Sequence, residues 1–123
     1  MASELRVNTL KDASGNNSIA TSVVHSGTAK AWGILDGTGT VGITNSYNCA
    51  SITDNSTGDY TVTYANAFDS ANHSSTMTVG DGCIGARCNG GRTTTTVNYQ
   101  CLSTSFGVQD DDFLSLTCHG DLA

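Results

Sequence analysis

The chain has 123 residues, a mass of 12.7 kDa and a formal net charge of −6, and only 13% of its residues are charged. This length fits a single domain, and so few charges exclude a charge-driven disordered tail. The five basic residues are scattered along the chain, whereas nucleic acids and anionic membrane surfaces select clustered lysine and arginine. The composition therefore predicts a protein that binds no nucleic acid.

Large apolar residues are scarce in this sequence. It holds seven Leu, five Ile, eight Val and three Phe, while Thr, Ser, Asn and Gly together account for 56 residues. Threonine suits the pleated surface of a strand, and Gly and Asn supply the turn positions between strands. The sequence therefore predicts an all-β domain with a thin core that gains stability by oligomerisation.

The first 25 residues differ from the rest of the chain. Alternation over 5–9, a Gly–Asn turn over 14–17 and a Thr/Ser-rich run to Val24 predict a strand and a turn in an N-terminal arm. We expect this arm, residues 1–25, to pack on a partner. Residues 26–123 are predicted to form one β-sandwich or jelly-roll-like domain.

Beyond the arm, period-two alternation of apolar and polar residues predicts a series of short strands, and three-and-four spacing typical of helices is almost absent. The clearest strand runs from Tyr60 to Tyr64. Trp32 and Ile34 share one face against Ala31 and Gly33, which predicts another strand. The remaining predicted strands are centred on Val41–Ile43, Met77–Val79, Val97–Cys101 and Leu114–Cys118.

The sequence contains no proline, and its two lysines both precede Trp32. Proline and edge lysines are common protections of an exposed sheet edge. Closure of the sheet, or pairing with neighbouring subunits, is the expected alternative, which again predicts a homo-oligomer. The sequence also has no apolar run approaching ~18 residues and opens without a signal-like apolar region, so we expect no membrane insertion and synthesis in a cytoplasm.

Five cysteines kept in a cytoplasm are expected to be made in reduced form. Zinc usually requires four ligands in tight pairs, whereas Cys101 and Cys118 are isolated and alternate in phase with apolar residues, which indicates small core residues. His119 beside Cys118 does not complete such a set. A Cys83–Cys88 disulfide that closes the Gly-rich stretch is the alternative, formed only after release into an oxidising medium.

The sequence contains few candidates for catalytic residues. The three histidines, His25, His73 and His119, have no Gly-x-Ser-x-Gly nucleophile motif to serve, and most aspartates occupy turns. We therefore predict that the protein is not an enzyme and carries no cofactor. The acidic run Asp110, Asp111 and Asp112 is the weak candidate for a metal site, but it lacks the alternating ligand spacing of a calcium loop, and a solvated loop is the favoured interpretation.

The Gly-rich stretch 80–91 has no phosphate-loop signature and is expected to be a long exposed loop. Exposed loops often carry contacts, so Arg87, Asn89 and Arg92 are the candidate binding residues; a mobile surface loop is the alternative. The aromatic residues Trp32, Tyr60, Tyr64 and Tyr99 could form a sugar-binding platform, but their in-phase placement favours core or interface positions.

Several blocks of the sequence resemble a known family. The opening Ser3–Gly15 looks like the start of many tail-fibre proteins, and Lys30–Trp32 with Gly37–Val41 is similar to the next block of that family. Ser51–Asn55 running into Gly58–Val62 is the most specific block, and the closing Gly120–Ala123 also matches. The chain thus resembles small fibre-like virion proteins of marine tailed bacteriophages of the cyanophage type.

This resemblance implies a virion structural protein, assembled in the host cytoplasm, that forms a short tail-fibre or knob-like appendage for host attachment. Its expected partners are its own copies in a homotrimer, other virion proteins of the tail or the major capsid protein, and a host surface receptor. The alternative is a head decoration or cement protein that stabilises the capsid shell. A polysaccharide depolymerase is a third hypothesis, which requires a deep groove lined by two carboxylates.

Overall fold

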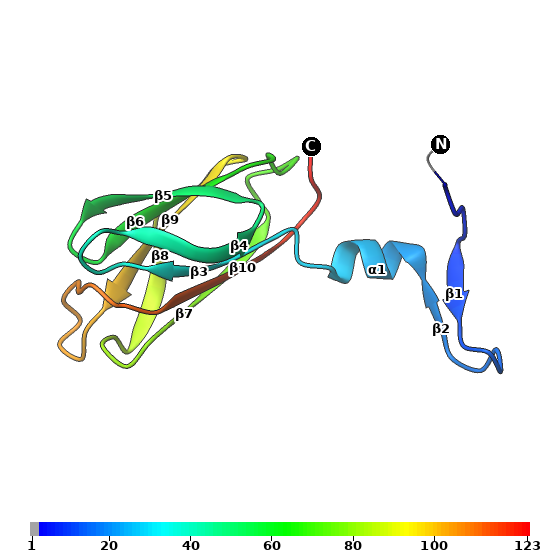
Figure 1. Ribbon diagram of the computed structural model, residues 1–123, viewed down its shortest axis with the longest axis horizontal. Helices are drawn as coiled ribbons and strands as arrows, with labels where there is room; N and C mark the ends of the chain where they lie inside the picture. The colour runs from blue at the N-terminus through cyan, green and yellow to red at the C-terminus, as the bar shows by residue number, and fades with distance from the viewer. Residues whose placement is uncertain (1–2) are drawn as a thin grey trace.

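The computed structural model describes residues 3–123 and consists almost entirely of antiparallel β-sheet. Two four-stranded sheets pack face to face and form the body of the molecule, and a small hairpin followed by a short helix projects from one end (Figure 1). The prediction of an all-β domain is confirmed.

The body contains eight strands in two sheets. The first sheet has the order β4-β3-β10-β7, and the second has the order β5-β6-β9-β8. Their bounds are β3 Ala31–Asp36, β4 Gly42–Tyr47, β5 Cys49–Ser56, β6 Asp59–Tyr64, β7 Ser74–Val79, β8 Gly85–Arg92, β9 Thr96–Leu102 and β10 Leu114–His119. The central strands of both sheets, β3, β10, β6 and β9, supply most of the core, because both of their edges are paired.

The core lies between the two sheets and follows the predicted alternation. In β6, Tyr60, Val62 and Tyr64 are buried. Strand β9 places its apolar residues opposite them, and β10 contributes from the other sheet. The buried residues of these two strands are Val97, Tyr99, Cys101, Leu114, Leu116 and Cys118. Strict alternation therefore identified the three most buried strands of the protein.

In strand β3 the buried face is not the one that carries the largest residue, Trp32. Ala31 and Leu35 are fully buried, whereas Trp32 is 37% exposed. Pairing with β10 explains this, because Leu35 lies opposite Leu114 and cross-strand partners share a face. Trp32 therefore lies on the outer face of the first sheet, opposite Tyr47 of β4.

The Gly-rich stretch that we expected to be an exposed loop is in fact largely strand β8. It pairs with β9, with Arg87 opposite Gln100 and Cys88 opposite Tyr99. The ladder is interrupted between Cys88 and Arg92, where Gly90 and Gly91 adopt positive φ. β8 is an edge strand of small and polar residues without apolar alternation, so periodicity does not predict it.

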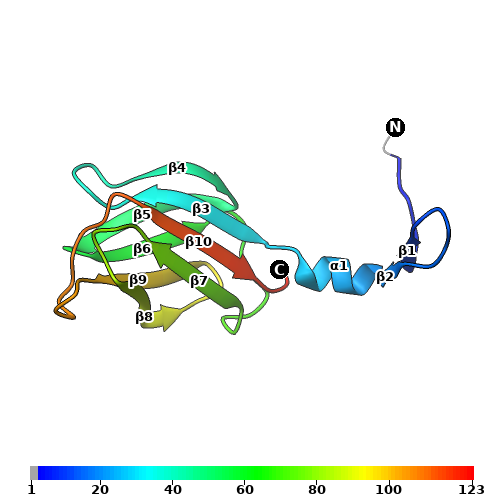
Figure 2. The same cartoon turned by 90° about the horizontal axis from the view of Figure 1, so that it is seen from below.

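The N-terminal segment forms β1 (Thr9–Lys11) and β2 (Ser18–Ala20), an antiparallel hairpin, followed directly by helix α1 (Thr21–Gly27). The helix was not expected, because its sequence is rich in Thr and Ser. Figures 1 and 2 both show this segment extending away from the body. No helix in residues 3–123 is long and apolar enough to cross a membrane.

The arm meets the body at few points. The Lys30 ammonium donates a hydrogen bond to the His25 carbonyl, and the His25 ring lies 3.3 Å from an Asp121 carboxylate oxygen. We call the described residues 3–28 the arm and residues 29–123 the body.

Candidate interaction surfaces

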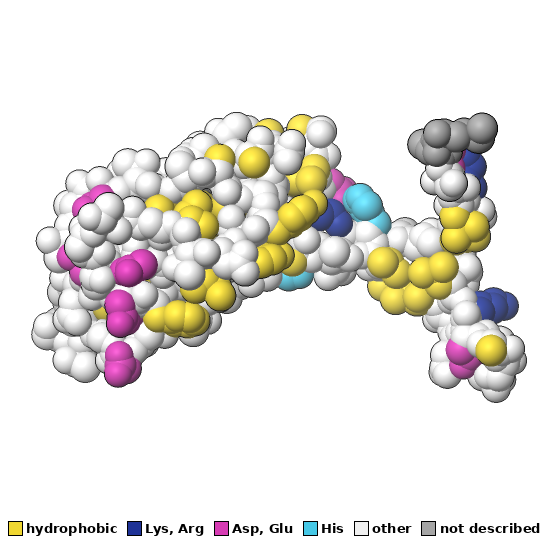
Figure 3. All heavy atoms as spheres, viewed as in Figure 1, with side chains coloured by type: hydrophobic (Ala, Val, Ile, Leu, Met, Phe, Trp, Pro, Cys, Tyr) yellow, Lys and Arg dark blue, Asp and Glu magenta, His cyan; other side chains and the backbone are white. Residues whose placement is uncertain are grey.

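The arm carries a group of apolar side chains that nothing in the described chain covers. None of the residues of α1 is buried, and Leu10 and Ile19 are exposed cross-strand partners in the hairpin. The exposed apolar residues of the arm are Leu5, Val7, Leu10, Ile19, Val23 and Val24. Figure 3 shows apolar side chains over both the helix and the hairpin. Such a concentration outside the body marks a candidate contact surface.

The hairpin of the arm is held by its own turn. The Asp12 carboxylate accepts hydrogen bonds from Ser14 Oγ at 2.9 Å, from Asn17 Nδ2 at 2.7 Å and from the Asn16 amide at 3.0 Å. The bonds from Ser14 and then Asn17 lower the pKa of Asp12 below its ordinary value of 3.8. The Thr21 amide also donates to the Asn8 carbonyl at 3.0 Å, which ties the start of α1 to the hairpin. The arm is therefore locally ordered although it is not covered.

Charge is divided unevenly between the arm and the body. The arm has one Glu, one Asp, one Arg and one Lys, so its formal charge is zero. The body has nine Asp, one Lys and two Arg, so it carries the whole charge of −6. Two bodies repel each other at close range, whereas an arm approaches an acidic body without that cost.

A second surface lies on the outer face of the β5-β6-β9-β8 sheet, centred on Asp59. This carboxylate is only 9% exposed and accepts hydrogen bonds from four side-chain amides. The donors are Asn98 Nδ2 at 2.8 Å, Asn55 Nδ2 at 2.9 Å, Gln100 Nε2 at 2.7 Å and Asn89 Nδ2 at 2.9 Å. Burial by itself raises the pKa of Asp59, but the four amides outweigh it, and the net pKa is lowered from 3.8.

The structure brings two of the three predicted binding residues into this surface. Arg87 donates to Gln100 Oε1 from Nε at 3.1 Å and from Nη2 at 2.7 Å, and Asn89 bonds directly to Asp59. Arg92 lies apart, with its Nε 3.4 Å from the Ala71 carbonyl. We call the set of Asn55, Asp59, Arg87, Asn89, Asn98 and Gln100 the polar face.

Sequence reasoning missed the centre of the polar face. The signal was present, because Asp59, Asn98 and Gln100 occupy the alternate positions of the two clearest strands. Residues that alternate with buried tyrosines must share the outer face, and β6 and β9 are neighbours.

The acidic run Asp110–Asp112 is only partly solvated, and its three carboxylates do not converge on one metal site. Asp110 accepts hydrogen bonds from the Gly58 amide at 2.6 Å and from the Tyr60 hydroxyl at 2.7 Å. Asp111, expected in solvent, is only 2% exposed, and its Oδ1 accepts from the Phe113 amide. Asp110 and Asp112 are both exposed. Within residues 3–123, no group of three or more His, Cys, Asp or Glu side chains is arranged to hold a metal ion.

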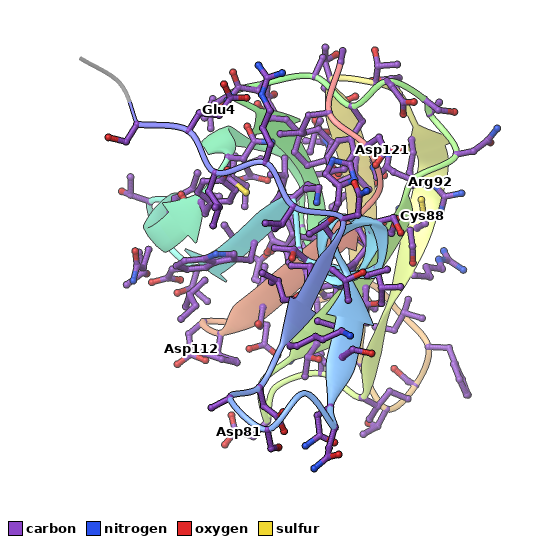
Figure 4. The ribbon with its side chains drawn as sticks, turned by 90° about the vertical axis from the view of Figure 1, so that its right-hand side faces the viewer. Glu4, Asp81, Cys88, Arg92, Asp112 and Asp121 are labelled. Atoms are coloured by element: carbon purple, nitrogen blue, oxygen red, sulfur yellow. The ribbon has the colours of Figure 1, made fainter. Side chains whose placement is uncertain are left out.

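All five cysteines are free thiols, and the Cys83–Cys88 disulfide, expected only in an oxidising medium, stays a prediction. Cys83 is buried, and its thiol donates to the Gln109 carbonyl at 3.5 Å, whereas Cys88 is exposed on the edge strand β8. Figure 4 shows Cys88 beside Arg92 at one edge of the body. Cys101 and Cys118 are fully buried in different sheets, as expected for small core residues.

The histidines serve separate local contacts. His73 is buried, stacks on Phe68 with ring centroids 4.1 Å apart, and donates from Nδ1 to the Ser70 carbonyl. Its Nε2 accepts from the Tyr64 hydroxyl at 2.9 Å, and the Cys118 sulfur lies 3.3 Å from the same hydroxyl. Burial raises the pKa of Tyr64 well above its ordinary value. These contacts seal one end of the core.

Searches of this sequence against protein-family models, and of the chain against curated proteins and solved structures, find no match. The interpretation of the two surfaces therefore depends on their geometry and on the chemistry of their residues.

Proposed function

We propose that this chain is a structural protein of a tailed-bacteriophage virion that acts by assembly and contact, as a short tail-fibre or knob-like appendage in host attachment. The observation that supports this proposal is the arm: an ordered segment with six exposed apolar side chains, held away from a compact acidic body.

The arm is too small to be stable on its own. Isolated two-stranded hairpins are marginal in water, and helices shorter than about 12 residues rarely persist alone. Helix α1 has seven residues, no side-chain cap at its N-terminus and no acidic residue in its first turn. Burying a Leu, Val or Ile side chain contributes roughly 1.5–3 kcal/mol, so a partner that covers the arm stabilises it substantially.

We place this partner in a neighbouring copy of the chain, within a homotrimer. The neutral arm can bridge two bodies that each carry −6, and the body offers an exposed aromatic pair, Trp32 and Tyr47, on its outer surface. Aromatic side chains of this kind are enriched at interfaces because they bury a large area with few rotatable bonds. We assign contact with a host receptor to the polar face, which contains two of the predicted binding residues, Arg87 and Asn89.

The second candidate is a head decoration or cement protein. The same arm favours it, because a segment that projects from one end of a compact sandwich suits attachment to a shell of major capsid protein. The body would then face outward from the capsid.

Self-association is tested by sedimentation velocity of the full chain at micromolar concentration. We expect an oligomer, and we expect Leu10→Asp combined with Val24→Asp to shift it to monomer while the melting of the body is retained. Thr104→Asp combined with Ser105→Asp is the matched control, since it adds the same two negative charges at exposed positions of the body and should leave the oligomer intact. A monomeric, thermally robust unaltered chain at this concentration contradicts the proposal.

The place in the virion is tested by quantitative gel densitometry and antibody labelling of purified particles of the phage that encodes the chain. Copies on the order of tens with label on the tail support an appendage, and copies on the order of hundreds with label on the head support decoration. Absence of the protein from the particles contradicts both assignments.

A further inference from the structure

Phe106 has the most exposed large apolar side chain of the body among the described residues. Its exposed fraction is 76%, and its backbone φ is +61°, a value that bulky residues rarely adopt. Two hydrogen bonds close this loop, from the Phe106 amide to the Ser103 carbonyl at 2.9 Å and from the Ser103 amide to the Gly107 carbonyl at 2.8 Å. Backbone strain of this kind gathers at functional sites, which makes Phe106 a candidate contact residue.

Two other exposed apolar residues, Ile84 and Val108, lie beside this loop. The Ile84 amide donates to the Leu102 carbonyl at 2.8 Å, and Val108 forms a β-bridge with Leu102. We call Ile84, Phe106 and Val108 the apolar tip. Figures 1 and 2 place the β7–β8 and β9–β10 loops, which contain the tip, at the end of the body farthest from the arm.

The hairpin of the arm has an open pocket of about 270 Å³, which we call the hairpin pocket. Leu10 and Ile19, which are cross-strand partners, form its apolar part. Pockets for drug-sized ligands hold roughly 300–1,000 Å³, so this one suits a single large side chain better than a small molecule. Its lining residues are Leu10, Lys11, Asp12, Asn17, Ser18 and Ile19.

The charges of the pocket and of the tip are complementary. The Lys11 ammonium forms no ion pair within the described chain, whereas the Asp12 carboxylate is occupied by donors of its own turn. Asp81 and Asp110 are exposed and lie close in sequence to the apolar tip, and Figure 3 shows acidic side chains gathered at this end of the body. The free ammonium of the pocket therefore favours the acidic surroundings of the tip.

We propose that Phe106 of one copy inserts into the hairpin pocket of the next copy, with Lys11 against the acidic surroundings of the tip. The arm and the tip lie at opposite ends of the molecule, so this contact joins different copies. Two different surfaces meet in it, and three such contacts can close a ring. The inference rests on the proposed self-association and adds the residues of one contact.

The first test compares two exposed phenylalanines by sedimentation velocity of the full chain. Phe106→Ala should raise the dissociation constant of the oligomer at least about tenfold, because an aromatic anchor is lost from its pocket. Phe113→Ala is the matched control and should leave the dissociation constant unchanged. Circular dichroism should show the same β-sheet signal in both variants, since neither side chain is part of the core.

The second test reverses the sign of the charge beside Phe106. Thr104→Asp with Ser105→Asp adds carboxylates to the acidic surroundings that face Lys11, so it should not weaken the contact. Thr104→Lys with Ser105→Lys places ammonium groups against Lys11 and should raise the dissociation constant. Equal dissociation constants for the two double variants would contradict the assigned position of Lys11.

The third test mixes two defective chains. Phe106→Ala retains the pocket, whereas Ile19→Asp retains Phe106 but places a carboxylate in the pocket. Each variant alone should be monomeric, and their equimolar mixture should form a heterodimer, because one intact pocket and one intact Phe106 remain. The mixture is measured at about 50 μM, since a single contact lacks the avidity of a closed ring.

The outcomes separate this inference from the proposed function. An unaltered chain that is oligomeric, with a dissociation constant that Phe106→Ala leaves unchanged, overturns the inference while self-association stands. A mixture that stays monomeric overturns it as well, because a contact between two different surfaces must be restored. A monomeric unaltered chain overturns both the inference and the proposed self-association.

Discussion

The hydroxyl of Tyr60 donates a hydrogen bond of 2.7 Å to Oδ1 of Asp110, which lies 50 residues further along the chain. The same oxygen accepts the Gly58 amide at 2.6 Å. One carboxylate thus ties the β5–β6 turn and the buried end of a core tyrosine to the loop that precedes β10.

Replacement of Asp110 by Ala should therefore destabilise the body. The substitution leaves the Gly58 backbone amide without its acceptor, while the Tyr60 hydroxyl keeps the Gly37 carbonyl at 2.8 Å, and we expect a loss of about 1–2 kcal/mol in the free energy of unfolding. The measurement is urea denaturation at fixed protein concentration and pH 7. Asp112→Ala is the matched control, since this exposed neighbour should change stability by no more than about 0.5 kcal/mol. Equal losses in the two variants would contradict the assigned role of Asp110.

Asp59 makes the stability of the protein depend on pH in the acid range. Its pKa is lowered in the folded state by the amides of the polar face, so folding favours the ionised form. The resulting stabilisation is fully present above the ordinary pKa of 3.8 and is lost as the pH falls through the lower folded value. Asp59→Asn should reduce stability by about 2 kcal/mol at pH 7 and should flatten the decline between about pH 5 and pH 2.

The measurement for Asp59 is a series of urea midpoints at half-unit pH steps, compared with those of the exposed-site variant Asp81→Asn. The control should retain the acid decline of the unaltered chain. If Asp59→Asn declines just as steeply, other carboxylates carry the pH dependence.

The fold could be predicted where burial imposes a pattern. Strands β6, β9 and β10 have both edges paired and one face in the core, so every second residue is expected to be apolar. Residues such as Tyr60, Val62 and Leu114 show this alternation and predict these strands. Edge strands carry no such constraint. Strand β8 is paired on one edge only and is largely exposed, so it can consist of Gly, Asn and Arg. A stretch of this composition predicts a loop rather than a strand.

The phase of β3 shows a different limit. Trp32 is the largest residue of its strand and suggested the inner face, but Ala31 and Gly33 are buried there instead, and Cys49 Sγ of the opposite sheet lies 3.5 Å from a Cβ built at Gly33. Side chains from both sheets fill the same space in a packed core. The sequence of one strand therefore cannot show how much room the opposite sheet leaves for its side chains.

The candidate surfaces were only partly predictable for a similar reason. Arg87 and Asn89 were identified as unusual polar residues in a Gly-rich stretch, but the carboxylate that organises them lies 30 residues before Asn89. Tertiary pairing of β6, β9 and β8 creates the polar face. The arm was recognisable by composition, yet its helix forms from a Thr/Ser-rich segment with no capping signal.

A comparison of Gly58 with Gly39 separates two costs of an alanine substitution, the strain of a positive φ and the clash of an added Cβ with its neighbours. Both have positive φ, +65° and +57°. A Cβ added at Gly58 would lie 2.5 Å from the Gln109 amide nitrogen, whereas nothing lies within 4 Å of one at Gly39. Gly39→Ala should therefore cost only the strain of a left-handed residue, about 1–2 kcal/mol.

Gly58→Ala should cost at least about 2 kcal/mol more than Gly39→Ala, because it adds a clash with backbone that Asp110 holds in place. Thermal and urea denaturation of both variants, with the Gly58→Ala, Asp110→Ala double variant, give the comparison. In the double variant the loop is released and can move away from the new methyl group, so its total loss should be smaller than the sum of the two single losses. Additive losses would mean that the 109–110 backbone is fixed by contacts other than the Asp110 carboxylate.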